Sequence, residues 1–96
     1  MSLFVVRHQH SPEHCPATDK QMAPILLTHL SRENAKQFGV TIQSEAVIDG
    51  AHTLYLIVDA LDKDNVHRYM EPFARAGSVE VLPASRCETV VERGVC

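Results

Sequence analysis

The chain has 96 residues, of which 45% are hydrophobic and 22% charged, and its formal net charge is −3 with the histidines neutral. This composition excludes a disordered chain and predicts a globular one. The length predicts a single domain over residues 1–96. The nine Lys and Arg residues are scattered along the chain, so binding to nucleic acid is not expected.

The first half of the chain predicts one strand followed by two helical segments. LFVVRHQ (3–9) mixes β-branched and aromatic residues, as strands do. A loop that contains two prolines comes next. QMAPILLTHL (21–30) has apolar residues near helical spacing, with Asp19 as a plausible N-cap. SRENAKQFG (31–39) predicts a short second helix that Ser31 would cap.

Two further strands and the turn between them follow. VTIQSEAVI (40–48) alternates apolar and polar residues, which predicts a half-exposed strand with Glu45 on its polar side. The Asp-Gly pair in DGAH indicates a hairpin turn. HTLYLIVDA (52–60) is apolar on both faces, which is typical of a central strand.

The last third predicts a helix over 62–77, with Gly77 ending it, because its apolar residues form one stripe. SVEVLPAS (78–85) predicts the last core strand, and residues 88–92 predict one more short strand. The order β-α-β-β-α-β is that of a ferredoxin-like α+β fold, in which both helices cover one face of an antiparallel sheet.

The other face of that sheet is expected to meet a partner. Strands 3–9 and 52–60 carry apolar side chains on both faces, and an uncovered apolar face usually marks an interface. We therefore expect a homodimer that packs through the open sheet face, with residues 89–91 reaching across. The longest apolar run, 54–58, is too short to cross a bilayer, and the N-terminus lacks a signal-peptide core. A cytoplasmic protein with no membrane partner is expected.

The pattern LFVVRH…EAVIDGAHTLYLIVDA…VHRYMEPFARAGSVEVLPASRCE, which runs from Leu3 to about Val91, resembles small bacterial proteins of the dimeric α/β-barrel superfamily. It is similar in particular to uncharacterised single-domain families that have nickel-binding proteins among their relatives. The resemblance implies a ferredoxin-like dimer and a metal ligand near the end of the first strand, at His8 or His10. Superfamily members also include haem-binding enzymes, monooxygenases and isomerases, so the fold alone selects no function.

The highest density of potential metal-binding side chains lies in RHQHSPEHCP (7–16), where three histidines and a cysteine fall within eight positions. His8 and His10 are two apart on a strand and so project to the same face. His14 and Cys15 follow in a loop short enough to fold back over the strand end. Imidazoles with a thiolate favour nickel, zinc or copper over magnesium or calcium. His52 begins the strand expected to run antiparallel to the first one, so it is a candidate auxiliary ligand.

Several alternatives stay open from the sequence. One alternative is a loop that is polar and nothing more; His8 would then be a buried histidine bonded to a backbone carbonyl, and Cys15 a small apolar filler. The leading hypothesis is a metal-binding protein for sequestration or sensing. The alternative is a small-molecule enzyme of the isomerase or monooxygenase type that uses the same histidines as acid–base groups, with no catalytic residue assigned. Cys87 would join the site only across a dimer interface, and His29 is expected at the surface.

Overall fold

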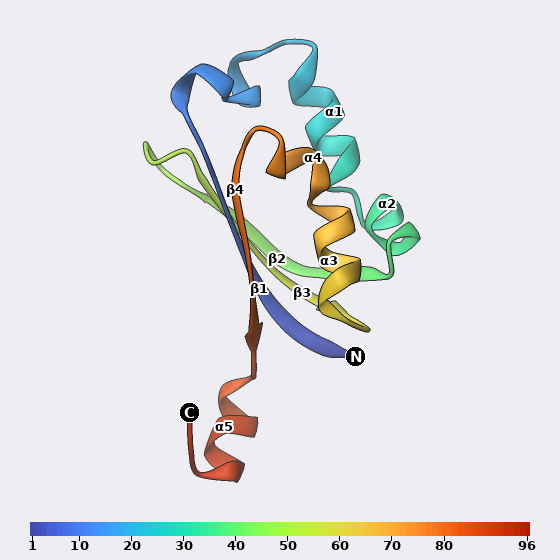
Figure 1. Ribbon diagram of the computed structural model, residues 1–96, viewed down its shortest axis with the longest axis vertical. Helices are drawn as coiled ribbons and strands as arrows, with labels where there is room; N and C mark the ends of the chain where they lie inside the picture. Colours follow the sequence, from blue (N-terminus) through green and yellow to red (C-terminus); the bar gives the residue numbers. More distant parts are fainter.

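A four-stranded antiparallel sheet forms the centre of the computed structural model, which describes residues 1–96 (Figure 1). The strand order is β2-β3-β1-β4, so the two most apolar strands are the inner ones. All three neighbouring pairs are antiparallel. The α+β architecture is compatible with a ferredoxin-like fold. The strands are β1 (Ser2–His10), β2 (Val40–Ile48), β3 (Thr53–Ala60) and β4 (Gly77–Ala84).

Helices cover one face of this sheet, and α5 stands away from it beyond the end of β4 (Figure 1). None of them combines the length and the apolar sequence needed to span a membrane. Two single-turn 3₁₀ helices, η1 (Pro12–His14) and η2 (Pro16–Thr18), follow β1. The α-helices are α1 (Met22–His29), α2 (Arg32–Gln37), α3 (Lys63–Tyr69), α4 (Glu71–Ala74) and α5 (Cys87–Arg93).

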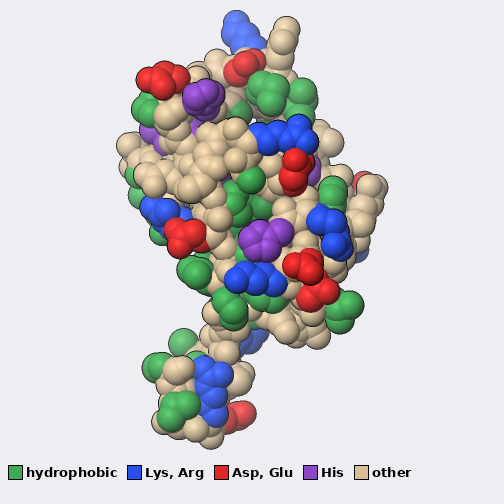
Figure 2. Space-filling model, viewed as in Figure 1, with side chains coloured by type: hydrophobic (Ala, Val, Ile, Leu, Met, Phe, Trp, Pro, Cys, Tyr) green, Lys and Arg blue, Asp and Glu red, His purple; other side chains and the backbone are tan.

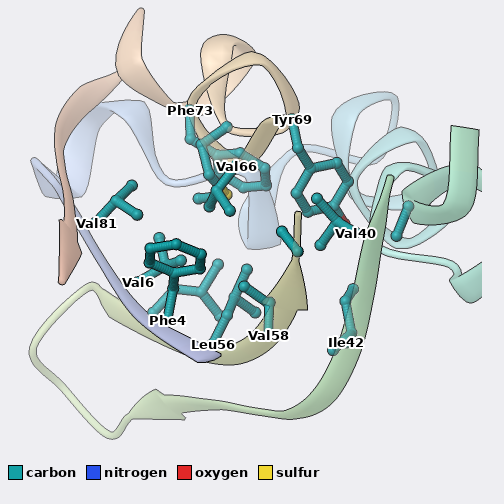
Figure 3. Close-up of a cluster of buried hydrophobic side chains, with 14 residues drawn as sticks. Phe4, Val6, Val40, Ile42, Leu56, Val58, Val66, Tyr69, Phe73 and Val81 are labelled. Atoms are coloured by element: carbon teal, nitrogen blue, oxygen red, sulfur yellow. The ribbon is translucent and has the colours of Figure 1, made fainter. Parts of the chain in front are cut away.

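The hydrophobic core lies between the covered face of the sheet and the helices α2, α3 and α4. Figure 3 shows Phe4 and Val6 of β1 beside Leu56 of β3, with Tyr69 and Phe73 above them. The Tyr69 hydroxyl donates a hydrogen bond to the backbone oxygen of His29 at 3.0 Å, and burial raises the pKa of Tyr69 to about 12. This hydrogen bond from a buried phenol therefore links α3 to α1. The full cluster is Phe4, Val6, Ala35, Val40, Ile42, Leu54, Leu56, Val58, Ala60, Val66, Tyr69, Met70, Phe73 and Val81.

The expectation that His29 lies at the surface was wrong. Its ring is half-buried and stacks on the ring of Tyr69, with centroids 4.8 Å apart. Its Nε2 donates to the backbone oxygen of Tyr69 at 2.7 Å. The histidine thus takes part in the packing of α1 on α3, and helical spacing alone does not reveal a contact between helices so far apart in sequence.

The opposite face of the sheet is uncovered and partly apolar. Ile57 and Leu82 are 40% and 47% exposed there, beside the half-buried Tyr55. Arg7 and Glu80 form an ion pair across β1 and β4 at 3.2 Å on the same face. Elsewhere at the surface, acidic and basic side chains are interspersed on the side shown in Figure 2, where α5 forms a separate lobe.

The C-terminal segment and the second helical region differ from the predictions. Residues 88–92 lie in α5, not in a strand, and this helix ends at Gly94, whose φ of 76° is the left-handed conformation that glycine adopts readily. The predicted helix 62–77 is two helices, α3 and α4, because Pro72 has no N–H to donate within a continuous helix.

The alternation of apolar and polar residues in β2 also breaks. A bulge between Ile42 and Ser44 turns Glu45 to the helix-covered side of the sheet, opposite Leu56.

Gly77 has a different role from the predicted helix end. It is the first residue of β4 and pairs with His10 at the end of β1. A Cβ built on Gly77 would lie 2.0 Å from the backbone oxygen of Gln9, a distance no side chain tolerates. Glycine therefore allows the start of β4 to pass close to the end of β1, where the candidate site lies.

Candidate metal centre

Three separate segments meet at the end of the sheet where β1 finishes. His10 is the last residue of β1, and its backbone N–H donates to the backbone oxygen of His52 at 3.1 Å, just before β3 begins. Cys15 lies between η1 and η2, in the loop that leaves β1. The antiparallel register that pairs Gln9 with Thr53 brings the two histidines to the same position along the sheet.

The side chains of His10, Cys15 and His52 converge. One potential ligand atom from each lies within 4.8 Å of the other two, and all three residues are half-buried. Ligands at 2.0–2.3 Å from a tetrahedral ion are separated by about 3.5 Å, so the three groups need to close by no more than about 1.3 Å to share one ion. Cys15 forms no disulfide, and its sulfur is available as a thiolate ligand.

A chain of two hydrogen bonds fixes the tautomer of His10. Nδ1 of His8 lies 3.0 Å from the backbone oxygen of Ser78, which can only accept, so His8 carries its proton on Nδ1. Nε2 of His8 is then an acceptor, and Nδ1 of His10, 3.2 Å away, donates to it. The remaining nitrogen of His10, Nε2, consequently keeps a free lone pair.

This Nε2 of His10 is a buried side-chain polar atom with no hydrogen-bond partner. Burial lowers the pKa of His10, and the neighbouring His52 and His14 lower it further by repulsion of a second positive charge. Burial also lowers the pKa of His8 more than its hydrogen bond to Ser78 raises it. Both rings are therefore held neutral, which is the protonation state that binds metals.

His52 is held in an uncommon backbone conformation. Its φ is 48°, and it is the one non-glycine residue of the chain with a positive φ. Left-handed backbone costs an L-residue about 1–2 kcal/mol, although histidine is enriched there relative to bulky residues. Such strain is concentrated at functional positions. Here it turns the imidazole of His52 toward His10, with ring centroids 5.4 Å apart.

The predicted ligand set divides into three roles. His10, Cys15 and His52 come together, as described above. His8 is 3% exposed and lies behind His10, bonded to a backbone carbonyl as one of the sequence alternatives anticipated. His14 is exposed, and its Nδ1 shares a hydrogen bond with the hydroxyl of Ser11 at 2.6 Å, so the structure does not place it in the cluster. Cys87 begins α5 and is exposed.

Two cavities adjoin the cluster. The hairpin cavity, of about 370 Å³, lies between α1 and the β2–β3 turn, and His10, Cys15 and His52 all line it. The loop cavity, of about 800 Å³, lies under η1 and η2, and its wall includes Cys15 and His14 but neither His10 nor His52. Cys15 thus stands between the two cavities, and the full cluster faces only the first.

Sequence reasoning missed the supports of the cluster. Ser78 contributes a backbone oxygen, which carries no side-chain signal, and its contact with His8 depends on the register between β1 and β4. Gly77 carried the one available signal, since a glycine at the start of a strand often marks a close backbone approach. Glycine is also common at the end of a helix, so the sequence signal at Gly77 fits a predicted helix end equally well.

Comparison with known proteins adds no family to this description. No family model matches the chain, and no curated protein sequence matches it. The likeness to dimeric α/β-barrel proteins therefore stays a prediction, and the functional argument depends on the geometry of the site itself.

The conformation of His52 is testable by a pair of substitutions. His52→Gly and His52→Ala both remove the imidazole, but only glycine adopts a φ of 48° without strain. We expect the glycine variant to be more stable than the alanine variant by about 1 kcal/mol. Urea unfolding in the presence of a chelator measures this difference. Equal stabilities, or a more stable alanine variant, would show that residue 52 is not held in the left-handed conformation.

Proposed function

We propose that this protein binds one transition-metal ion per protomer through His10, Cys15 and His52, and serves in sequestration or sensing of the ion in the cytoplasm. The observation that carries the proposal is the buried, unpartnered Nε2 of His10, in a residue whose side chain converges with a free thiol and a second imidazole. Leaving a buried polar atom without a partner costs about 1–3 kcal/mol, and an ion at this point would remove that cost.

The donor set favours a borderline or soft ion. A thiolate and two imidazoles suit zinc, nickel and copper, whereas magnesium and calcium require oxygen ligands. The sequence resembles relatives of nickel-binding proteins, so nickel is the first ion to test. A thiolate ligand also fits a compartment in which cysteines remain reduced, since an oxidised Cys15 would not bind.

The hydrogen bonds behind His10 support the same proposal. Metal-binding histidines usually donate their second ring N–H to a neighbouring acceptor, which fixes the ring and increases its basicity. Nδ1 of His10 does so to His8, which in turn donates to the carbonyl of Ser78. In this proposal His8 is a positioning residue and not a ligand.

Acid–base catalysis by the same histidines is the second candidate. The specific observation in its favour is the loop cavity, whose volume of about 800 Å³ is ample for a small substrate and whose wall includes His8 and His14. His8 has both ring nitrogens engaged in hydrogen bonds, however, so it has no free site for a substrate proton in this arrangement. For that reason we place catalysis behind metal binding.

Metal loading distinguishes the two candidates. Protein purified reduced and without a histidine tag should bind close to one equivalent of nickel, zinc or copper, measured by elemental analysis after gel filtration. A free-ion concentration 100 times Kd should stabilise the fold by about 2.7 kcal/mol, which a thermal melt detects. His10→Ala should abolish both effects, because it removes the central ligand. His67→Ala, an exposed histidine on α3, is the matched control and should change neither.

The role of His8 gives this experiment a second arm. His8→Ala should weaken the affinity by about 10–100-fold, as loss of a hydrogen-bonding support does at other metal centres. His8→Gln, which retains an acceptor near Nε2, should recover part of it. Substoichiometric metal in the parent protein, or full loading of His10→Ala, would remove these residues from the proposed function.

We further propose that the protein is a homodimer through the open sheet face. The partly apolar surface that includes Ile57, Leu82 and Tyr55 has no cover within one protomer, and its apolar side chains come from the inner strand β3 as well as the edge strand β4. A second copy would bury this face without requiring another protein.

Sedimentation velocity at micromolar concentration tests the assembly. We expect the mass of a dimer, and Ile57→Lys should convert it to a monomer by placing a charge in the interface. Leu61→Lys is the control, because Leu61 is 73% exposed just beyond the end of β3 and should leave the dimer intact. A parent protein that sediments as a monomer contradicts the proposal.

A further inference from the structure

The cluster offers three protein ligands and no fourth. No carboxylate or further histidine lies within 4.8 Å of all three potential ligand atoms of His10, Cys15 and His52. Nε2 of His8 is occupied as the acceptor from His10. A tetrahedral ion held by three side chains keeps one coordination position for an exogenous ligand, which distinguishes reactive zinc sites from closed structural ones.

The direction of that position follows from the cavities. The hairpin cavity is the one that all three residues line, so a ligand in the fourth position would extend into it. Its volume of about 370 Å³ lies at the lower end of the range of small-molecule sites, which is roughly 300–1,000 Å³. The cavity therefore has room for a ligand of a few heavy atoms beyond the donor atom.

The lining of the hairpin cavity defines the chemistry of the occupant. Beyond the cluster the wall is largely aliphatic, with α1 contributing one side and the strands the other. Two carboxylates, Glu45 and Asp49, also line it, and both are exposed. Negative charge there disfavours an anionic ligand. The principal apolar lining residues are Leu26, Leu27, Leu30, Val47, Leu54 and Phe73.

We propose that the metal centre is an open site that takes a small uncharged molecule, with one metal-binding donor atom on a short apolar chain, into the hairpin cavity. This inference rests on the proposed metal binding at His10, Cys15 and His52. It names the class of molecule that the loaded protein recognises: the donor atom completes the coordination sphere, and the chain replaces water between α1 and the β2–β3 turn.

Cobalt spectroscopy with two matched imidazoles tests the proposal. The protein is loaded with Co²⁺, whose charge-transfer band reports the Cys15 thiolate and whose d–d bands report the other ligands. The loaded protein is then titrated with 1-methylimidazole and with 1-butylimidazole. Both should change the d–d bands, and the butyl compound should bind at least tenfold more tightly, because each buried methylene contributes about a fourfold gain.

Two variants locate the chain in the cavity. Leu27→Ser alters the wall of the hairpin cavity at a residue that is 71% exposed, so folding should tolerate it. It should reduce the preference for the butyl compound to a few-fold. Ile25→Ser is the control, because Ile25 is 58% exposed on the same helix and lines the loop cavity instead. It should leave the preference at its parent value.

The outcomes separate this inference from the function on which it rests. A protein that gives no thiolate-to-cobalt band overturns both. A cobalt protein whose spectrum ignores both imidazoles has a closed site, which overturns the inference and leaves metal binding in place. Equal affinity for the two compounds, or equal loss in Leu27→Ser and Ile25→Ser, shows that the chain does not enter the hairpin cavity and also overturns it.

Discussion

Two hydrogen bonds in series organise the end of the sheet that carries the candidate site. The carbonyl of Ser78 accepts from His8, and His8 accepts from His10, so the proton positions on both rings are determined by one backbone oxygen. The direction of the free lone pair on His10 is a consequence of that order. Because the carbonyl belongs to β4 and both histidines to β1, the pairing of these two strands positions the candidate ligand.

The same strand pairing depends on a single small residue. Gly77 allows β4 to start directly beside the end of β1, since a Cβ at that position would meet the oxygen of Gln9 at 2.0 Å. On the other side of β1, the antiparallel register and the left-handed backbone of His52 bring the second imidazole forward. The sheet thus supplies two donors in a fixed relation, and the loop with Cys15 supplies the third. Closing the loop over the strand ends is what an ion would add.

Much of the fold was predictable because it depends on local periodicity. The alternation and apolar runs of the strands identified the antiparallel sheet, and the strand predicted at 40–48 has those bounds in the structure. Features that depend on distant contacts were not predictable in the same way. The bulge after Ile42 reverses the side on which Glu45 lies, and the segment 88–92 is helical and does not join the sheet.

The candidate site shows the same difference between local sequence patterns, which were informative, and distant contacts, which were not. The density of histidine and cysteine in the sequence pointed to the end of β1 where His10 and Cys15 converge, and antiparallel order pointed to His52. Sequence spacing did not separate His8 from His10, although one is bonded to a carbonyl and the other has a free nitrogen. The difference arises because the ring of His8 reaches the carbonyl of Ser78 on the neighbouring strand β4. Two histidines on the same face of one strand look equivalent in sequence until such neighbours are known.

X-ray absorption of the protein loaded with zinc or nickel tests the central claim most directly, because it reads the atoms bound to the ion. The account predicts one sulfur at about 2.3 Å and two imidazole nitrogens at about 2.0 Å, with the sulfur absent in Cys15→Ser. A first shell of oxygen atoms alone, or a sulfur that persists in that variant, would contradict it.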